Sequence, residues 1–234
     1  MIQRRVLSWW PDLLLLAAFG ALTVALIDGH LLGLDERVAA WSLAHQPAVP
    51  YWTARALNYL GQGGQVLTPV ALILTGLLVR RTHSLRAALP GIAAYVVTFL
   101  TIGPMKIFFD RAAPRYTGPD KVEMFNAVAS GKLSMSYPSG HLGNSLVWYA
   151  VFAILAAALL GRALTGWEFF AIRVLPVAIV FVTTVYTGFH WLTDSIAGLL
   201  LGLLLARLLD RIPWDRIPLP APRGWNGPAF SASR

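Results

Sequence analysis

The chain has 234 residues, of which 56% are hydrophobic and only 13% are charged. Soluble domains carry about 25% charged residues, so this composition is typical of an integral membrane protein. The chain contains no cysteine, which excludes disulfide bonds and thiolate metal sites. The formal net charge is +8, but the basic residues are spread between apolar runs and form no cluster or stripe, so nucleic acid is not an expected partner.

Six apolar runs predict an all-α membrane protein, a single bundle of six transmembrane helices within residues 1–211. In chain order the predicted spans cover residues 10–28, 63–79, 86–105, 141–161, 168–188 and 191–209. The first run resembles a signal peptide only superficially, because it is too long and lacks a convincing small-residue cleavage site. We expect Pro176 to kink the fifth span or delay its start.

The segments that connect the runs differ in character. Residues 29–62 mix charged and aromatic residues and predict one or two amphipathic helices in the membrane interface. Residues 106–140 form the longest polar stretch. Residues 212–234 are rich in proline and glycine, and we expect them to form a flexible cytoplasmic tail.

The distribution of arginines predicts the orientation in the membrane. When the N-terminus is placed in the cytoplasm, most arginines fall on the cytoplasmic side, which the positive-inside rule favours. Both ends of the chain are then cytoplasmic. Lys106, His141, His190 and Asp194 all lie at the outer side of the cell membrane in this arrangement.

The segment Pro138-Ser139-Gly140-His141 precedes the fourth span directly. Proline and serine favour a helix start, so the free backbone N–H groups of the first turn should point outward, where they suit a phosphate oxyanion. Ser139 adds a hydroxyl donor, and Gly140 permits close approach of a ligand. His141 is then suited to protonate a leaving oxygen as general acid. The alternative is a helix cap beside an interfacial histidine.

His190 and Asp194 are four residues apart, which places them on one face if the segment is helical. A carboxylate beside an imidazole fixes its tautomer and raises its basicity, which prepares His190 for nucleophilic attack on phosphorus. The alternative is a buried polar pair. His141 would complete a set of three metal ligands, but no His-x-x-x-His pair or carboxylate cluster supports a metal, and no cofactor is expected. Lys106, at the end of the third span, either binds phosphate or reaches for the interface.

Together these segments resemble the type 2 phosphatidic acid phosphatases. That family has three signature blocks: Lys, six residues, Arg-Pro; then Pro-Ser-Gly-His; then Ser-Arg, five residues, His, three residues, Asp. The second block is complete at residues 138–141, the third is present in His190 and Asp194, and the first extends from Lys106 to Pro114. The resemblance covers spans three to six, and its catalytic core is about residues 100–205.

The resemblance implies a metal-independent phosphatase that acts on a lipid phosphate in the bilayer through a phosphohistidine on His190. Asp194 would orient His190, and His141 would protonate the leaving oxygen. Phosphatidic acid, phosphatidylglycerol phosphate and polyprenyl phosphates or diphosphates are the implied substrates. Two other interpretations stay open: a phosphotransferase that passes the phosphoryl group to an alcohol, and a catalytically weakened protein that binds lipid phosphates. A vanadate haloperoxidase is disfavoured, because the soluble haloperoxidases do not have six spans.

Two positions depart from the family's pattern. Ala113 stands where the first block has arginine, and Thr184 stands where the third block has arginine. In the family these arginines join the lysine in binding phosphate, and such an arginine contributes about 10³–10⁵ in rate. Arg111 and Arg115 flank Ala113, and we expect one of them to bind phosphate instead, while Thr184 donates a hydrogen bond. Lys132 is a more distant candidate.

Overall fold

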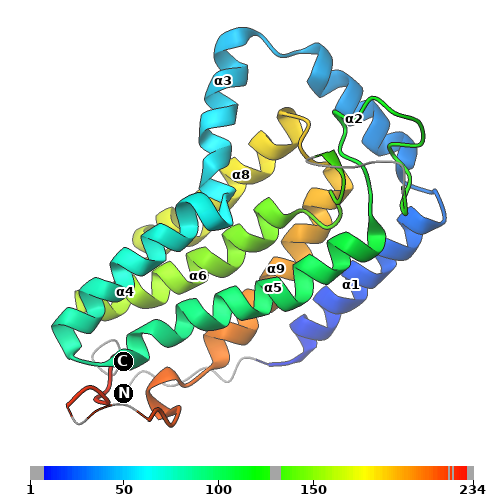
Figure 1. Ribbon diagram of the computed structural model, residues 1–234. Coiled ribbons are helices and arrows are strands. Elements are labelled where there is room, and N and C mark those ends of the chain that lie inside the picture. The colour runs from blue at the N-terminus through cyan, green and yellow to red at the C-terminus, as the bar shows by residue number, and fades with distance from the viewer. Residues whose placement is uncertain (1–7, 127–132, 221, 223, 231–234) are drawn as a thin grey trace.

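The computed structural model describes residues 8–126, 133–220, 222 and 224–230, and these residues form an all-helical bundle (Figure 1). Six helical segments in this part of the chain are long and apolar enough to cross a membrane: Trp10–Ile27, Gly63–Thr82, Leu85–Phe109, Gly140–Leu160, Gly166–Tyr186 and Leu192–Arg211. They confirm the six predicted spans, with ends that differ by four residues at most. The agreement arises because a span must be apolar along its whole length to lie in lipid.

Several spans combine α-helix with a turn of another helical type. The elements of the six spans are α1 (Trp10–Ile27), η2 (Gly63–Leu67) with α4 (Thr68–Thr82), η3 (Leu85–Ala88) with α5 (Leu89–Phe109), α6 (Gly140–Leu160), α7 (Gly166–Phe169) with η5 (Phe170–Val174) and α8 (Leu175–Tyr186), and α9 (Leu192–Arg211). The π-helical turn η5 ends just before Pro176, so the helix of the fifth span is irregular near the proline that predicted a kink or a late start.

α6 and α9 form the centre of the bundle, and α1, α4, α5 and α8 pack around them (Figure 1). Most of α6 and more than half of α9 are buried, whereas the other spans expose most of their apolar surface. Such exposure is what helices that face lipid require. The two central helices therefore supply a rigid axis for any side chains at their ends.

Small residues bring the backbones of α6 and α9 together. A Cβ atom on Gly198 would lie 2.5 Å from the carbonyl oxygen of Ser139, and one on Gly202 would lie 3.0 Å from Cα of Gly143. Glycine at such positions permits the close backbone approach that stabilises helix pairs in membranes. The contact fixes the start of α6 against the first turns of α9.

Residues 29–62 form two helices, α2 (Leu32–Ala44) and α3 (Ala48–Leu57), followed by the short turn η1 (Asn58–Gly61). Figure 1 shows α2 and α3 at the end of the bundle opposite the C-terminal segment. The sequence predicted one or two helices in this segment, and the structure has two. Their position next to the ends of α8 and α9 puts them beside the predicted catalytic residues.

The described part of the C-terminal segment, which the sequence predicted to be a flexible tail, contains buried residues. After the short turn η6 (Trp214–Arg216), the chain folds back so that Trp214 and Phe230 are buried. The Asp215 carboxylate accepts the backbone N–H groups of Ala229 at 2.7 Å and Phe230 at 3.1 Å. Two aromatic side chains and one carboxylate thus make specific contacts in a segment that is otherwise rich in proline and glycine.

We predict that Gly198→Ala destabilises the protein by about 1–3 kcal/mol, because the added methyl group overlaps the Ser139 carbonyl. Denaturant unfolding in detergent measures the change. Gly76→Ala is the matched control, since a Cβ at Gly76 meets no atom within 4 Å. The control should keep or gain up to about 1 kcal/mol. Equal stability of the two variants would contradict the tight α6–α9 contact.

Candidate active site

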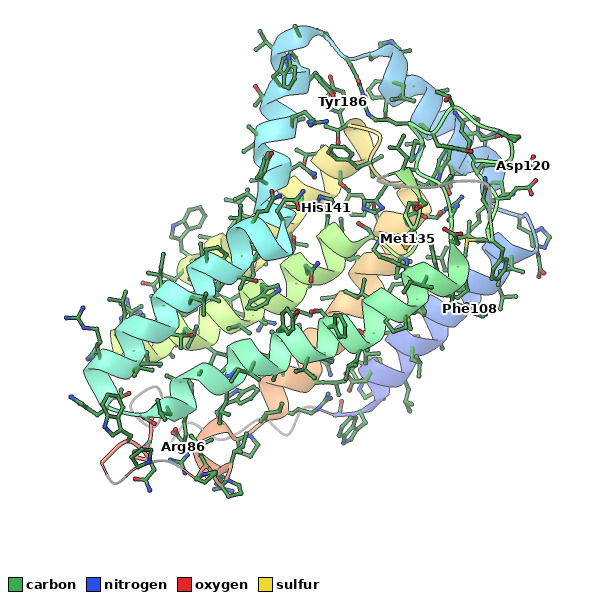
Figure 2. The ribbon with its side chains drawn as sticks, viewed as in Figure 1. Arg86, Phe108, Asp120, Met135, His141 and Tyr186 are labelled. Atoms are coloured by element: carbon green, nitrogen blue, oxygen red, sulfur yellow. The ribbon has the colours of Figure 1, made fainter. Side chains whose placement is uncertain are left out.

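A cavity of about 360 Å³ lies where the end of α5 meets the starts of α6 and α9. Figure 2 labels two of its lining residues, His141 and Met135, near the end of the bundle from which α2 and α3 project. The lining is mostly polar or glycine: Gly61, Gln62, Gly63, Lys106, Ala113, Ser134, Met135, Ser136, Gly140, His141, Asn144, Phe189 and His190. Four residues predicted from the sequence, Lys106, Gly140, His141 and His190, are thus brought to one cavity.

The Pro138–His141 segment turns into α6 as predicted. Ser139 is the N-cap residue, and its hydroxyl accepts the backbone N–H of Leu142 at 3.4 Å. Ser139 is fully buried and its backbone N–H donates to the carbonyl oxygen of Asp194 at 2.9 Å, so its side chain serves the helix and does not line the cavity. A Cβ on Gly140 would lie 3.1 Å from Cε of Lys106, so glycine gives this lysine its path along the cavity wall.

His141, His190 and Asp194 lie in a row. Nδ1 of His141 is 3.2 Å from Nε2 of His190, and Nδ1 of His190 is 3.8 Å from Oδ2 of Asp194. Asp194 is fully buried. Burial lowers the pKa of His190 below its usual value, against the opposing effect of Asp194, so the imidazole is neutral at pH 7 and offers a lone pair.

His190 and Asp194 lie close together, but not because they share one face of a helix, as the sequence predicted. His190 precedes α9, which begins at Leu192, so the two residues do not share a helix face. Asp194 lies in the first turn, and its Oδ2 accepts the backbone N–H of Trp191 at 3.0 Å. The carboxylate that caps the start of α9 therefore also lies next to the imidazole of His190, which precedes that helix.

Arg111 does not line the cavity, although the sequence suggested it as a phosphate ligand. Its guanidinium is fully buried and donates to Asp194 Oδ1 at 2.7 Å, to Asp35 Oδ2 at 2.8 Å and to Thr193 Oγ1 at 2.9 Å. Nε donates to the Val122 carbonyl at 2.8 Å. The loss of hydration lowers the pKa of Arg111, but its two carboxylate neighbours outweigh this and raise it. This placement supports a structural ion-pair role and not phosphate binding.

Arg115 and Thr184 lie beside the cavity and do not line it. Nε of Arg115 donates to the Thr187 carbonyl at 2.5 Å, and Nη2 donates to Gln46 Oε1 at 3.0 Å. The side chain packs on Gly188, two residues before His190. The buried hydroxyl of Thr184 has no hydrogen-bond partner among the described residues. Lys132 lies outside the residues that the structure describes.

Lys106 is the only lysine or arginine among the described residues that line the cavity, and its Nζ donates to the Met135 carbonyl at 2.5 Å. Ala113 forms part of the wall. The methyl group of Ala113 therefore lies in the wall at a position where the family resemblance predicts an arginine. In the described part of the chain, no group of three His, Cys, Asp or Glu residues is arranged to hold a metal ion.

Sequence reasoning missed three residues of the site. Asn144 follows His141 by three positions on α6 and lines the cavity, which helical spacing indicates. Gln62 also lines it, and its Nε2 lies 3.2 Å from Nε2 of His141. The available signal was a polar residue between two glycines at the start of a span. Asp35 on α2 pairs with Arg111 across 76 positions, and no local pattern marks it.

Two further cavities continue the first one toward the apolar flank of the bundle. A cavity of about 290 Å³ shares Lys106, Gly140 and Asn144 with the first cavity and extends along α4 and α5. A third, of about 230 Å³, shares Tyr95 and Trp148 with the second and is lined almost entirely by apolar atoms. Neighbouring cavities thus share wall residues, and the third includes the exposed side chains of Leu72 and Ile92.

Comparisons with known proteins give a family and a fold. The sequence model of the PAP2 superfamily matches residues 87–218, which include Lys106, His141, His190 and Asp194. The chain is similar to the crystal structure of the first transmembrane PAP2 type phosphatidylglycerolphosphate phosphatase from Bacillus subtilis, with 20% sequence identity and a TM-score of 0.66. The similarity covers 86% of this chain and 94% of the other. No curated protein matches the chain.

We predict that Arg111→Ala lowers the free energy of unfolding by about 3–5 kcal/mol, because it leaves the buried carboxylates of Asp35 and Asp194 without a cation. Chemical denaturation in detergent provides the measurement. Arg115→Ala is the control, because its hydrogen-bond acceptors are neutral, and it should cost less than about 2 kcal/mol. An Arg111→Ala protein of normal stability that loses only phosphate affinity would restore the role suggested by the sequence.

Proposed function

The chain belongs to the PAP2 superfamily, and on that basis we propose that it is a membrane phosphatase that hydrolyses a lipid phosphate or diphosphate through a phosphohistidine intermediate. The observation that carries this proposal is the row of His141, His190 and Asp194 at a polar cavity, with contacts of 3.2 Å and 3.8 Å. A neutral imidazole backed by a carboxylate is an activated nucleophile, and a second histidine within hydrogen-bond distance supplies acid–base chemistry.

In the proposed first step, Nε2 of His190 attacks phosphorus and forms a P–N bond. The P–O bond to the lipid breaks, and the leaving oxygen takes a proton from the imidazolium of His141. Asp194 stabilises the positive charge that develops on His190. In the second step, water attacks phosphorus and gives a proton to His141, and the P–N bond breaks. Inorganic phosphate leaves, and both histidines return to their starting states.

Phosphate binding in this proposal depends on Lys106 and the start of α6. The free backbone N–H groups of the first helical turn and the positive end of the helix dipole favour an oxyanion beside Gly140. Ser139 acts indirectly by capping that turn. We assign Arg115 to the rim, where it packs on Gly188, and Thr184 remains a donor without a partner in the described part of the chain.

The proposed substrate is an amphiphile because the catalytic cavity continues into apolar ones. The cavity along α4 and α5 begins at Lys106 and Gly140 and reaches Tyr95 and Phe99, which suits an acyl or prenyl chain. We also propose that the site faces the outer side. Asp12, at the start of α1, pairs with Arg207 and Arg211 at the end of α9, far from the site, and positive charge favours the cytoplasmic side.

A phosphotransferase is the second candidate, and Ala113 favours it. The small side chain in the cavity wall leaves room beside His190 for an alcohol that would take the place of water. Phosphatidic acid, phosphatidylglycerol phosphate and a polyprenyl diphosphate should be assayed in micelles with and without a sugar or inositol. Free phosphate in both conditions supports hydrolysis. Product that carries phosphate only when the alcohol is present supports transfer.

We predict that His190→Ala abolishes phosphate release from every active lipid in that panel, because the variant lacks the atom that attacks phosphorus. Purified protein and a phosphate assay are sufficient. His30→Ala is the control, since His30 is exposed in the turn after α1 and should retain normal activity. Normal turnover by His190→Ala would exclude the phosphohistidine mechanism.

The pH dependence provides a separate prediction. His190 must be neutral to attack, and its lowered pKa keeps it neutral at pH values where an ordinary histidine, with a pKa of 6.5, is half protonated. The low-pH limb of kcat/KM should therefore lie below pH 6.5, because this parameter reports the free enzyme. A limb centred at or above that value would mean that His190 is not buried as described or is not the nucleophile.

A further inference from the structure

The helix α3 directs a guanidinium toward the bundle. It precedes the region that matches the family and lies against the end of α8 (Figure 1). Val49 and Trp52 are exposed and form its outward face. Tyr51, Ala54 and Arg55 are buried or half-buried and form its inward face. Tyr51 and Arg55 are one helical turn apart, and Nη1 of Arg55 donates to the Tyr51 hydroxyl at 3.4 Å.

The inward face of α3 reaches a wall residue of the catalytic cavity. Cζ of Arg55 lies 4.8 Å from the ring centroid of Phe189, which lines the cavity and directly precedes His190. The ring of Phe189 is nearly parallel to that of His141, with an angle of 6° and 6.0 Å between centroids. Arg55 itself does not line the cavity. One aromatic side chain thus contacts both this guanidinium and the imidazole of the proposed general acid.

A second guanidinium lies at the same place. Cζ of Arg115 is 5.2 Å from the ring centroid of Tyr51, and Cζ of Arg55 is 6.0 Å from that centroid. The hydrogen bonds of Arg115 go to neutral acceptors, the Thr187 carbonyl and the Gln46 side chain. Two positive charges are thus held around one tyrosine ring at the rim of the cavity.

The charge of these two arginines is not balanced within the described part of the chain. Neither guanidinium pairs there with a carboxylate, although both side chains are half-buried. An aromatic ring attracts a cation but has no net charge, so the contacts with Tyr51 and Phe189 leave the positive charge available. Two like charges around one ring repel each other, and an anion between them would offset that repulsion. Five other arginines of the same part each pair with a carboxylate: Arg111, Arg162, Arg173, Arg207 and Arg211.

We propose that Arg55 and Arg115 form a second anion site, which binds a phosphate carried by the leaving group of the substrate. This inference rests on the proposed phosphatase function. In that mechanism His141 protonates the leaving oxygen, so the leaving group begins beside His141 and next to Phe189, over which Arg55 lies. A phosphate there meets two guanidiniums, whose planar forks match phosphate oxygens. The phosphate that is attacked stays with Lys106 and the start of α6, so the two sites are distinct.

The second site selects a chemical class of lipid. A lipid with a single phosphate, such as phosphatidic acid, releases an uncharged alcohol, which gives the site nothing to bind. A prenyl diphosphate releases a prenyl monophosphate, and phosphatidylglycerol phosphate releases a lipid with a phosphodiester. Both of these leaving groups carry a phosphate, and this shared group is what the two guanidiniums recognise.

The experiment compares lipids in matched pairs: a prenyl diphosphate with the monophosphate of the same chain, and phosphatidylglycerol phosphate with phosphatidic acid of the same acyl chains. Arg55→Met keeps an unbranched side chain against Phe189 but removes the charge. It should lower the ratio of kcat/KM within a pair, two phosphates over one, by about 10–10²-fold, because hydrogen bonds to a charged group are lost. The pair that responds identifies the lipid that the site takes. An unchanged ratio in both pairs would overturn the proposal.

Arg37→Met is the matched control. Arg37 is exposed on α2, at the same end of the bundle, and does not line the catalytic cavity. Its variant removes the same charge from the same end of the protein and should leave the ratio unchanged. If Arg55 served only to pack against Phe189, Arg55→Met would lower kcat/KM equally for both lipids of a pair. That result, or an equal change of the ratio in Arg37→Met, would overturn the proposal.

Binding without turnover separates this inference from the proposed function. His190→Ala lacks the proposed nucleophile, so calorimetric titration of the lipid pairs into this variant in detergent measures affinity alone. The lipid with two phosphates should bind at least about 10-fold more tightly than its partner, and adding Arg55→Met should remove the preference. If the preference depends on Arg55 while wild type releases no phosphate from any lipid, the anion site is supported and the phosphatase assignment fails. An active enzyme whose preference does not depend on Arg55 overturns the anion site alone.

Discussion

The buried ion pairs of Arg111 with Asp194 and Asp35 are the interaction on which the rest of the site depends. Asp194 has no contact with solvent, and a carboxylate there stays charged only beside a cation and hydrogen-bond donors. Arg111 supplies the cation at 2.7 Å, and the Trp191 N–H donates at 3.0 Å. The backbone carbonyl of Asp194 accepts the Ser139 N–H at 2.9 Å. One residue thus joins the loop after α5 with the starts of α6 and α9, and Asp35 adds α2.

The same ion pairs determine how much positive charge is left for a ligand. The formal charges of Arg111 and Lys106 are balanced by those of Asp35 and Asp194, and the two histidines add none when they are neutral. A phosphate in the cavity therefore meets Lys106 and the dipole of α6, but no excess of fixed cations among the described lining residues. The guanidinium of Arg111, which flanks Ala113 in the sequence, adds no free charge, because it is already paired with both carboxylates.

Hydropathy and signature spacing predicted the six spans and the meeting of Lys106, His141, His190 and Asp194, because both signals are local in the sequence. The contacts of Arg111 with Asp194 and of Gln62 with His141 span 83 and 79 positions, and no periodicity or short motif indicates such contacts. The expectation that Arg111 binds phosphate had a sound chemical basis, since a guanidinium pairs with phosphate and carboxylate in the same geometry. Only the fold determines which anion is present.

Because the cavity has few cations, the proposed reaction depends on other groups to stabilise negative charge on the phosphate. The lipid tail already lies in an apolar medium before it binds, so its transfer into the cavities along α4 and α5 yields little hydrophobic free energy. Confinement of the lipid to the bilayer instead raises its local concentration around the protein, which lowers KM without raising kcat. Charge that develops on the phosphoryl oxygens has to be met by Lys106, the start of α6 and His141. In the proposed reaction, protonation of the leaving oxygen by His141 therefore contributes a larger share of the rate than it would beside additional cations.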